Sequence, residues 1–137
     1  MKQSRRKLFV DWGKCDPAGI VFYPQFFIWF DDNTTQLFAS VGLRTSAMFR
    51  QRGMKGMPLV DVRARFLASC HFGDELESVS EIAEWGRTSF KVAHRLFNEG
   101  TLAVEGFETR VWAVADPADP ARMKGGAIPQ DVKDLLS

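Results

Sequence analysis

Asp16 is the first residue of this chain with a clear potential for chemistry, because it lies in a turn directly ahead of a long apolar segment. The turn reads CDPAG, and the apolar segment begins at Ile20. An aspartate followed by proline commonly opens a turn, so a purely conformational role is the ordinary interpretation. A carboxylate can also act as a general base, or as a nucleophile toward an activated ester. The residue alone leaves both interpretations open.

A helix is expected to begin a few residues after Asp16. Pro24 suits a first helical turn, where its missing N–H removes no hydrogen bond, and Gly42 marks a stop. Residues at helical spacing between them are Phe27, Phe30, Thr34, Leu37, Phe38 and Val41. This pattern predicts a helix over 24–41. The outward N–H groups at its N-terminus carry partial positive charge and could hold a developing oxyanion beside the Asp16 carboxylate.

The same helix should have a partly polar back. The residues expected on this back are Asp31, Asp32, Asn33 and Gln36. Residues 5–11 are predicted to form a short strand, and residues 12–19 a loop rich in Gly and Pro. A second, shorter helix should cover 45–53, with Thr45 or Ser46 as its N-terminal cap.

Most of the remaining chain has the alternation of strands. Strands are predicted over 60–66, 74–85, 88–97 and 102–115, the first of them half-buried. Residues 98–101 should form a hairpin turn, and Gly106 should mark a bulge or a close approach. Residues 116–127 are predicted to be a loop or ragged edge, and 129–137 a short terminal helix. The expected fold is therefore a single α+β domain over 1–137, with one apolar helix covered by a curved antiparallel sheet.

Composition excludes several classes of protein. The 137 residues are 45% hydrophobic and 26% charged, which is enough for one core and a soluble surface. The formal net charge of +1 gives no overall field to attract nucleic acid. Two cysteines and the lack of a signal-like segment favour the cytoplasm, and no run is long enough to span a membrane.

The segment CDPAGIVFYPQFFIWFD resembles the signature of the hot-dog-fold acyl-CoA thioesterases, specifically the 4-hydroxybenzoyl-CoA thioesterase family. A second segment, EWGRTSF at 84–90, is similar to a Trp-basic-basic-Ser-Phe segment of that family, and the order of strands fits nearly the whole chain. Tyr23-Pro24 stands where a related branch has Tyr-His, which favours the aromatic-type branch. Gly86 and Thr88 replace basic residues of the second segment.

The resemblance implies a hot-dog fold, an acyl-CoA substrate, no cofactor or metal, and a homodimer or homotetramer. It makes Asp16 the catalytic carboxylate, as nucleophile or as base, and the backbone N–H of Tyr23, or of a later residue such as Gln25, the oxyanion donor. Asp31 would approach a ring hydroxyl, although a solvated helix aspartate remains the alternative. The other residues it assigns to substrate binding are Phe22, Pro24, Arg87, Ser89 and Lys91, with Arg122 and Lys124 as weaker candidates for the phosphates of coenzyme A.

Three other interpretations compete with this one. Cys15 could be a nucleophile with His71 or His94 as its base, but nothing in the sequence fixes either histidine near it, and His94 on an apolar strand face suits a core residue. A non-catalytic acyl-CoA or acyl-carrier-protein binding module would keep the fold without needing the Asp16 carboxylate. A hot-dog dehydratase would use a histidine, and none occurs in the turn or the long helix.

Overall fold

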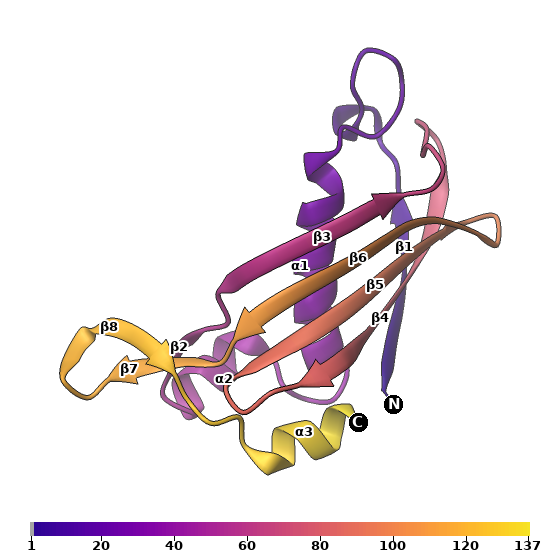
Figure 1. Ribbon diagram of the computed structural model, residues 1–137. Helices are drawn as coiled ribbons and strands as arrows, with labels where there is room; N and C mark the ends of the chain where they lie inside the picture. The colour runs from indigo at the N-terminus through magenta and orange to yellow at the C-terminus, as the bar shows by residue number, and fades with distance from the viewer. Residues whose placement is uncertain (1) are drawn as a thin grey trace.

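The computed structural model describes residues 2–137 and has one long helix, α1, lying against one face of an antiparallel sheet (Figure 1). The sheet has the strand order β1-β4-β5-β6-β3. Its strands are β1 (Gln3–Phe9), β3 (Leu59–Phe66), β4 (Glu75–Trp85), β5 (Ser89–Asn98) and β6 (Thr101–Val111). A smaller sheet has the order β2-β7-β8, formed by β2 (Met54–Gly56), β7 (Ala113–Asp116) and β8 (Asp119–Gly125). The helical segments are η1 (Trp12–Lys14), α1 (Pro24–Ala39), α2 (Thr45–Gln51) and α3 (Gln130–Leu136). The predicted α+β hot-dog architecture is confirmed.

Helix α1 buries a stripe that is apolar at both ends and polar in the middle. Phe26, Trp29 and Phe30 pack into one hydrophobic cluster, and Leu37 and Phe38 into a second. Between the clusters the buried helix residues are Asn33 and Thr34. Burial of a large apolar side chain contributes about 1.5–3 kcal/mol, so the two clusters hold the helix on the sheet. The prediction that Asn33 lies on an exposed back was wrong, because its side chain hydrogen-bonds Ser78 and Arg6.

Gly106 allows α1 to approach the sheet closely. A Cβ atom at this position would lie 2.4 Å from the ring of Phe30, which is closer than any side chain permits. Gly106 pairs with His94 and Ala64 on the neighbouring strands, so it stands in the middle of the sheet under the helix. The predicted close approach is confirmed.

The region after β6 differs from its prediction. The chain leaves the main sheet at Trp112, whose N–H donates to the carbonyl of Thr88, and continues as β7. Strand β8 then pairs with β7, where a loop or ragged edge was predicted. The resulting hairpin projects from the body (Figure 1), and nearly all of β8 is exposed. A strand without a buried face has no apolar alternation, which explains the missed strand.

Several element ends also differ from prediction by a few residues. Helix α1 ends at Ala39 rather than Val41, and β1 covers 3–9 rather than 5–11. The N-cap of α2 is Arg44, and neither Thr45 nor Ser46 provides a side-chain cap. The turn at 98–101 is confirmed, with positive φ at Glu99 (49°) and Gly100 (81°). None of the helices in residues 2–137 has the length and apolar character needed to cross a bilayer.

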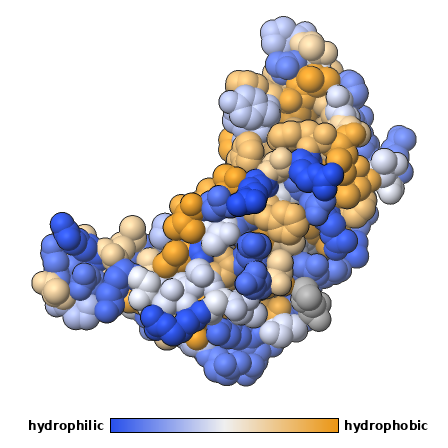
Figure 2. Space-filling view, viewed as in Figure 1, coloured by the Kyte–Doolittle hydropathy of each residue, from blue (hydrophilic) through white to orange (hydrophobic). Residues whose placement is uncertain are grey.

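Strand β3 is an edge strand whose apolar face is covered in the middle and exposed at its two ends. Val62 and Ala64 are partly buried against the cluster that contains Phe26 and Phe30, as the prediction of a half-buried strand expects, whereas Val60 and Phe66 at the ends of the same face retain 61% and 51% of their accessible surface. Hydrophobic side chains gather along this edge in Figure 2. The other edge, β1, instead carries ion pairs such as Arg5–Glu77 and Lys7–Glu75. The two edges of the sheet are therefore chemically different.

Candidate active site

The carboxylate of Asp16 is fixed by its own turn. Its Oδ1 accepts a hydrogen bond from the N–H of Ala18 at 2.9 Å, and its N–H donates to the carbonyl of Ile20 at 2.9 Å. The turn ends at Gly19, whose φ of +78° suits glycine. Asp16 thus has the conformational role expected of an Asp-Pro turn. Within residues 2–137 its Oδ2 has no hydrogen-bond partner, and that oxygen can take part in chemistry.

The N-terminus of α1 offers one backbone donor beside this turn. The N–H of Gln25 donates to the carbonyl of Phe22 at 2.9 Å, and Pro24 has no N–H. The N–H of Tyr23 has no acceptor within residues 2–137. Of the two donors that the sequence suggested, Tyr23 and Gln25, Tyr23 is therefore the one with a free N–H. The antiparallel bridge between Cys15 and Val21 ties the Asp16 turn to the residues just before the helix.

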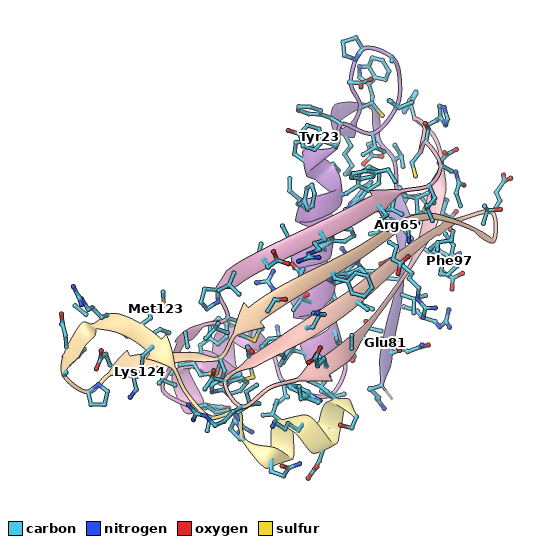
Figure 3. The ribbon with its side chains drawn as sticks, viewed as in Figure 1. Tyr23, Arg65, Glu81, Phe97, Met123 and Lys124 are labelled. Carbon is cyan, nitrogen blue, oxygen red and sulfur yellow. The ribbon has the colours of Figure 1, made fainter. Side chains whose placement is uncertain are left out.

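A hollow of about 320 Å³ opens beside Tyr23. It lies between the N-terminus of α1 and the C-terminal end of β3, and Figure 3 shows Tyr23 at that end of the molecule. Its lining consists of Ile20, Val21, Tyr23, Phe26, Phe66, Leu67, Ala68, Ser69 and Cys70. Such an apolar lining suits an acyl group. The contribution of 67–69 was not predicted, because these residues lie far from Tyr23 in the sequence.

The two other predicted residues at the start of the helix lie at the edge of this region. Phe22 is exposed and packs edge-on against the ring of Tyr23, with 5.5 Å between the ring centroids. Pro24 is half-buried in the first turn of α1. Neither residue is among those that line the hollow.

Asp31 forms an ion pair that the sequence did not indicate. Its Oδ1 accepts from Nη2 of Arg110 at 2.7 Å, although 65% of the Asp31 side chain is exposed. Arg110 comes from β6 and is only 8% exposed. Asp31 is therefore exposed, as the alternative of a solvated helix aspartate expects, but it also forms an ion pair with Arg110 that this alternative does not include.

Behind Arg110 lies a buried polar network that fills the middle of the α1–sheet interface. Glu108 accepts hydrogen bonds from Nη2 of Arg110 at 2.6 Å and from Nε2 of His94 at 2.9 Å, and also from the hydroxyl of Thr34. Nδ1 of His94 pairs with the hydroxyl of Ser80 at 2.7 Å. The prediction of His94 as a hydrogen-bonded core residue is confirmed. Burial alone would raise the pKa of Glu108, but the hydrogen bonds and charges of His94 and Arg110 outweigh it and lower the pKa to about 2.

The residues predicted to bind coenzyme A lie away from the Asp16 turn and the start of α1. Lys91 and Ser89 line hollows on the sheet face opposite α1, together with Phe107, Thr109 and the unpredicted Arg63. Arg87 is exposed in the β4–β5 turn. Lys124 lies on the projecting hairpin, at the opposite end of the molecule from Tyr23 (Figure 3). One chain therefore does not bring these cations to Asp16.

The geometry disfavours a cysteine nucleophile. The thiol of Cys15 donates to the carbonyl of Asp11 at 3.5 Å, and no hydrogen bond in residues 2–137 joins it to a histidine. Burial and the neighbouring Asp74 raise the pKa of the Cys70 thiol to about 11. A thiol with that pKa supplies very little of the reactive thiolate at neutral pH.

Comparison with known proteins places this fold and site in a class. Residues 10–135 match the model of the Thioesterase-like superfamily. The chain therefore belongs to this superfamily of hot-dog-fold proteins. Within it, the resemblance to the 4-hydroxybenzoyl-CoA thioesterase family is confirmed: the enzyme of that name from Pseudomonas sp. (strain CBS-3) is 31% identical over 136 residues, covering 93% of each chain.

Solved structures agree with this assignment. A mutant 4-hydroxybenzoyl-CoA thioesterase in complex with 4-hydroxybenzoyl-CoA has a TM-score of 0.90 and 29% identity, covering all of both chains. A gentisyl-coenzyme A thioesterase has a TM-score of 0.83 and 28% identity, covering 98% of this chain and 100% of its own. These relatives confirm the predicted class of enzyme, a thioester hydrolase.

Proposed function

We propose that this protein hydrolyses the thioester of an aryl acyl-CoA to the free acid and coenzyme A, and that it favours a substrate resembling 4-hydroxybenzoyl-CoA. The observation that carries the proposal is the presence of two groups in the short segment that leads from the Asp-Pro turn into α1, whose N-terminus borders the apolar hollow. One is the Asp16 carboxylate with its free Oδ2, and the other is the unpaired N–H of Tyr23. The names of the relatives support the aryl substrate.

In the proposed reaction the thioester oxygen accepts a hydrogen bond from the N–H of Tyr23, which stabilises the oxyanion of the tetrahedral intermediate. Asp16 acts in one of two ways. As a nucleophile it bonds to the carbonyl carbon, the C–S bond breaks, the thiolate of coenzyme A leaves and is protonated, and water hydrolyses the mixed anhydride. As a base it takes a proton from water, whose oxygen bonds to the same carbon; the C–S bond then breaks, and the thiolate of coenzyme A leaves and takes up the proton from Asp16. Both routes give the same products.

In the proposed complex the aryl group extends from the hollow along the side of α1 that starts at Tyr23. Tyr23, Phe27 and Asp31 follow one another at i, i+4 and i+8, so they lie along one side of the helix. The rise of an α-helix puts Asp31 about 12 Å beyond Tyr23, a length that accommodates a carbonyl, one aromatic ring and a hydrogen bond at each end. Asp31 can then accept the hydrogen bond of a para-hydroxyl.

The substrate proposal is tested by kcat/KM for 4-hydroxybenzoyl-CoA, benzoyl-CoA and palmitoyl-CoA, in the wild type and in Asp31→Ala. We expect the wild type to prefer both aryl esters to palmitoyl-CoA and the hydroxylated ester to benzoyl-CoA. Asp31→Ala should narrow the gap between the two aryl esters about tenfold, because the hydroxyl loses a charged acceptor. Palmitoyl-CoA as the best wild-type substrate would refute the aryl preference.

We further propose that the active enzyme is a homodimer or homotetramer acting in the cytoplasm, where its two free cysteines stay reduced. The edge of β3 supports self-association, because it exposes Leu59, Val60 and Phe66 next to unpaired backbone groups. A second copy would cover this edge and contribute its Ser89 and Lys91, so the cations that bind coenzyme A need not come from the chain that holds Asp16. Each active site is then built from two chains.

The Val60→Lys variant should be monomeric where the wild type is a dimer or tetramer, since the substitution puts a charge on the apolar edge of β3. The measurement is molar mass by light scattering at micromolar concentration, with hydrolysis assayed on the same samples. Lys7→Ala on the β1 edge is the matched control and should leave the mass unchanged. A monomeric wild type would exclude the proposed assembly.

A further inference from the structure

The ion pair between Asp31 and Arg110 links an exposed side chain of α1 to the buried polar network around Glu108. Nη2 of Arg110 donates both to Oδ1 of Asp31 at 2.7 Å and to Oε2 of Glu108 at 2.6 Å. Nη1 donates to the carbonyl of Met57 at 2.9 Å. The Glu108 carboxylate and the Met57 carbonyl therefore fix the orientation of the guanidinium. The exposed carboxylate of Asp31 is its third hydrogen-bond partner.

Stability alone does not account for this arrangement. Glu108 already neutralises the buried guanidinium, and an ion pair to a carboxylate that is 65% exposed contributes little to folding. Among the buried side-chain nitrogen and oxygen atoms of residues 2–137, Nε of Arg110 is the one without a hydrogen-bond partner. Arg110 thus reaches Asp31 in an orientation that leaves one of its own donors unsatisfied, which is unfavourable for a buried polar atom.

We propose that Arg110 is a positioning residue that sets the preference for a hydroxylated ring by holding the Asp31 carboxylate in one orientation. Its hydrogen bond occupies Oδ1, and Oδ2 stays free to accept from the substrate. The proposal rests on the function proposed above, in which Asp31 meets the ring hydroxyl. It adds the residue that makes Asp31 selective, which comes from a different element, β6.

The shared hydrogen bond also keeps Asp31 a strong acceptor. The guanidinium of Arg110 donates to two carboxylates, Asp31 and Glu108, so its positive charge is shared between them, although Glu108 also accepts from His94. Arg6 approaches the neighbouring Asp32 at 3.9 Å, and within residues 2–137 it forms no ion pair with Asp31. Hydrogen bonds to a charged acceptor are about twice as strong as neutral ones. A fixed carboxylate that keeps part of its charge therefore discriminates between a hydroxyl and a hydrogen atom at the same place on the ring.

The test is a double-mutant cycle on the ratio of kcat/KM for 4-hydroxybenzoyl-CoA to that for benzoyl-CoA. The variants are Asp31→Asn, Arg110→Lys and the two together, because lysine keeps the charge that neutralises Glu108 but cannot hold two carboxylates and a carbonyl in one plane. We expect each single variant to lower the ratio about tenfold and the double variant to lower it no further than Asp31→Asn. Arg5→Lys, at an exposed ion pair on β1, is the control and should keep the ratio.

The outcomes separate the two proposals. An unchanged ratio in Asp31→Asn overturns the role of Asp31 and, with it, that of Arg110. A lowered ratio in Asp31→Asn but not in Arg110→Lys overturns the role of Arg110 alone, as does an additive loss in the double variant. If Arg110→Lys does not fold, Glu108→Gln replaces it in the cycle. Glutamine keeps the side-chain volume but leaves Arg110 to neutralise Asp31 alone, so the ratio should again fall, and an unchanged ratio overturns the proposal.

Discussion

Asp16→Asn is expected to lower kcat by about a thousandfold or more, while the fold and the binding of substrate are retained. Asparagine keeps the side-chain oxygen that accepts from the N–H of Ala18, so the turn should persist. It lacks the carboxylate that attacks the thioester or activates water. The measurements are kcat under saturating 4-hydroxybenzoyl-CoA, the dissociation constant of the same ester on the variant, and the thermal midpoint.

Asp11→Asn is a matched control for this variant. Asp11 lies in the same segment, is exposed and pairs with Lys14 at 2.7 Å, so its loss should change kcat by less than about twofold. Retention of most of the wild-type turnover in Asp16→Asn would move the chemistry to another group, with Cys15 the first to examine. Binding without any turnover in the wild type would instead favour the non-catalytic acyl-CoA binding module.

Glu108→Ala should destabilise the protein by about 3–5 kcal/mol, because it leaves Arg110 and His94 buried without their common acceptor. The free energy of unfolding from urea titration is the measurement. Glu77→Ala is a suitable control: it removes a carboxylate from an exposed ion pair on β4 and should cost at most about 1 kcal/mol. A similar loss in both variants would show that the buried network has no special role in stability.

The same carboxylate predicts an acid limb in the stability of the wild type. The pKa of Glu108 falls from an ordinary 4.5 to about 2 on folding, so the folded state binds its proton less readily than the unfolded state. Its contribution is therefore complete above about pH 4.5 and is lost as the pH falls from there toward about 2. Glu108→Ala should flatten this part of the profile, measured as unfolding free energy against pH. An equally steep limb in the variant would assign the acid sensitivity to other carboxylates.

The sequence by itself determined the parts of this protein that depend on neighbours along the chain. The 3.6-residue period and Pro24 predict α1, and alternation predicts the strands of the main sheet, because both patterns follow from local backbone geometry. Asp16 and Tyr23 also lie within one short segment, so the proposal of a carboxylate and an oxyanion donor near the start of α1 depends only on local sequence. The close approach at Gly106 could also be predicted, since a glycine inside a strand indicates a bulge or a close neighbour.

Only the tertiary structure decided which polar residues are buried and which apolar ones are exposed. Two charged residues of β6, Glu108 and Arg110, have the spacing of side chains on a solvent-facing side of a strand, yet they face α1. Glu108 bonds to His94, which lies 14 residues away in the sequence. Arg110 bonds to Asp31, which lies 79 residues away. Val60 and Phe66 show the reverse, because alternation puts them on the same face of β3 as the partly buried Val62 and Ala64, but β3 is the edge of the sheet and the chain covers only the middle of that face. Alternation identifies the two faces of a strand, whereas burial depends on what packs against each face, and that is fixed by contacts between distant parts of the chain.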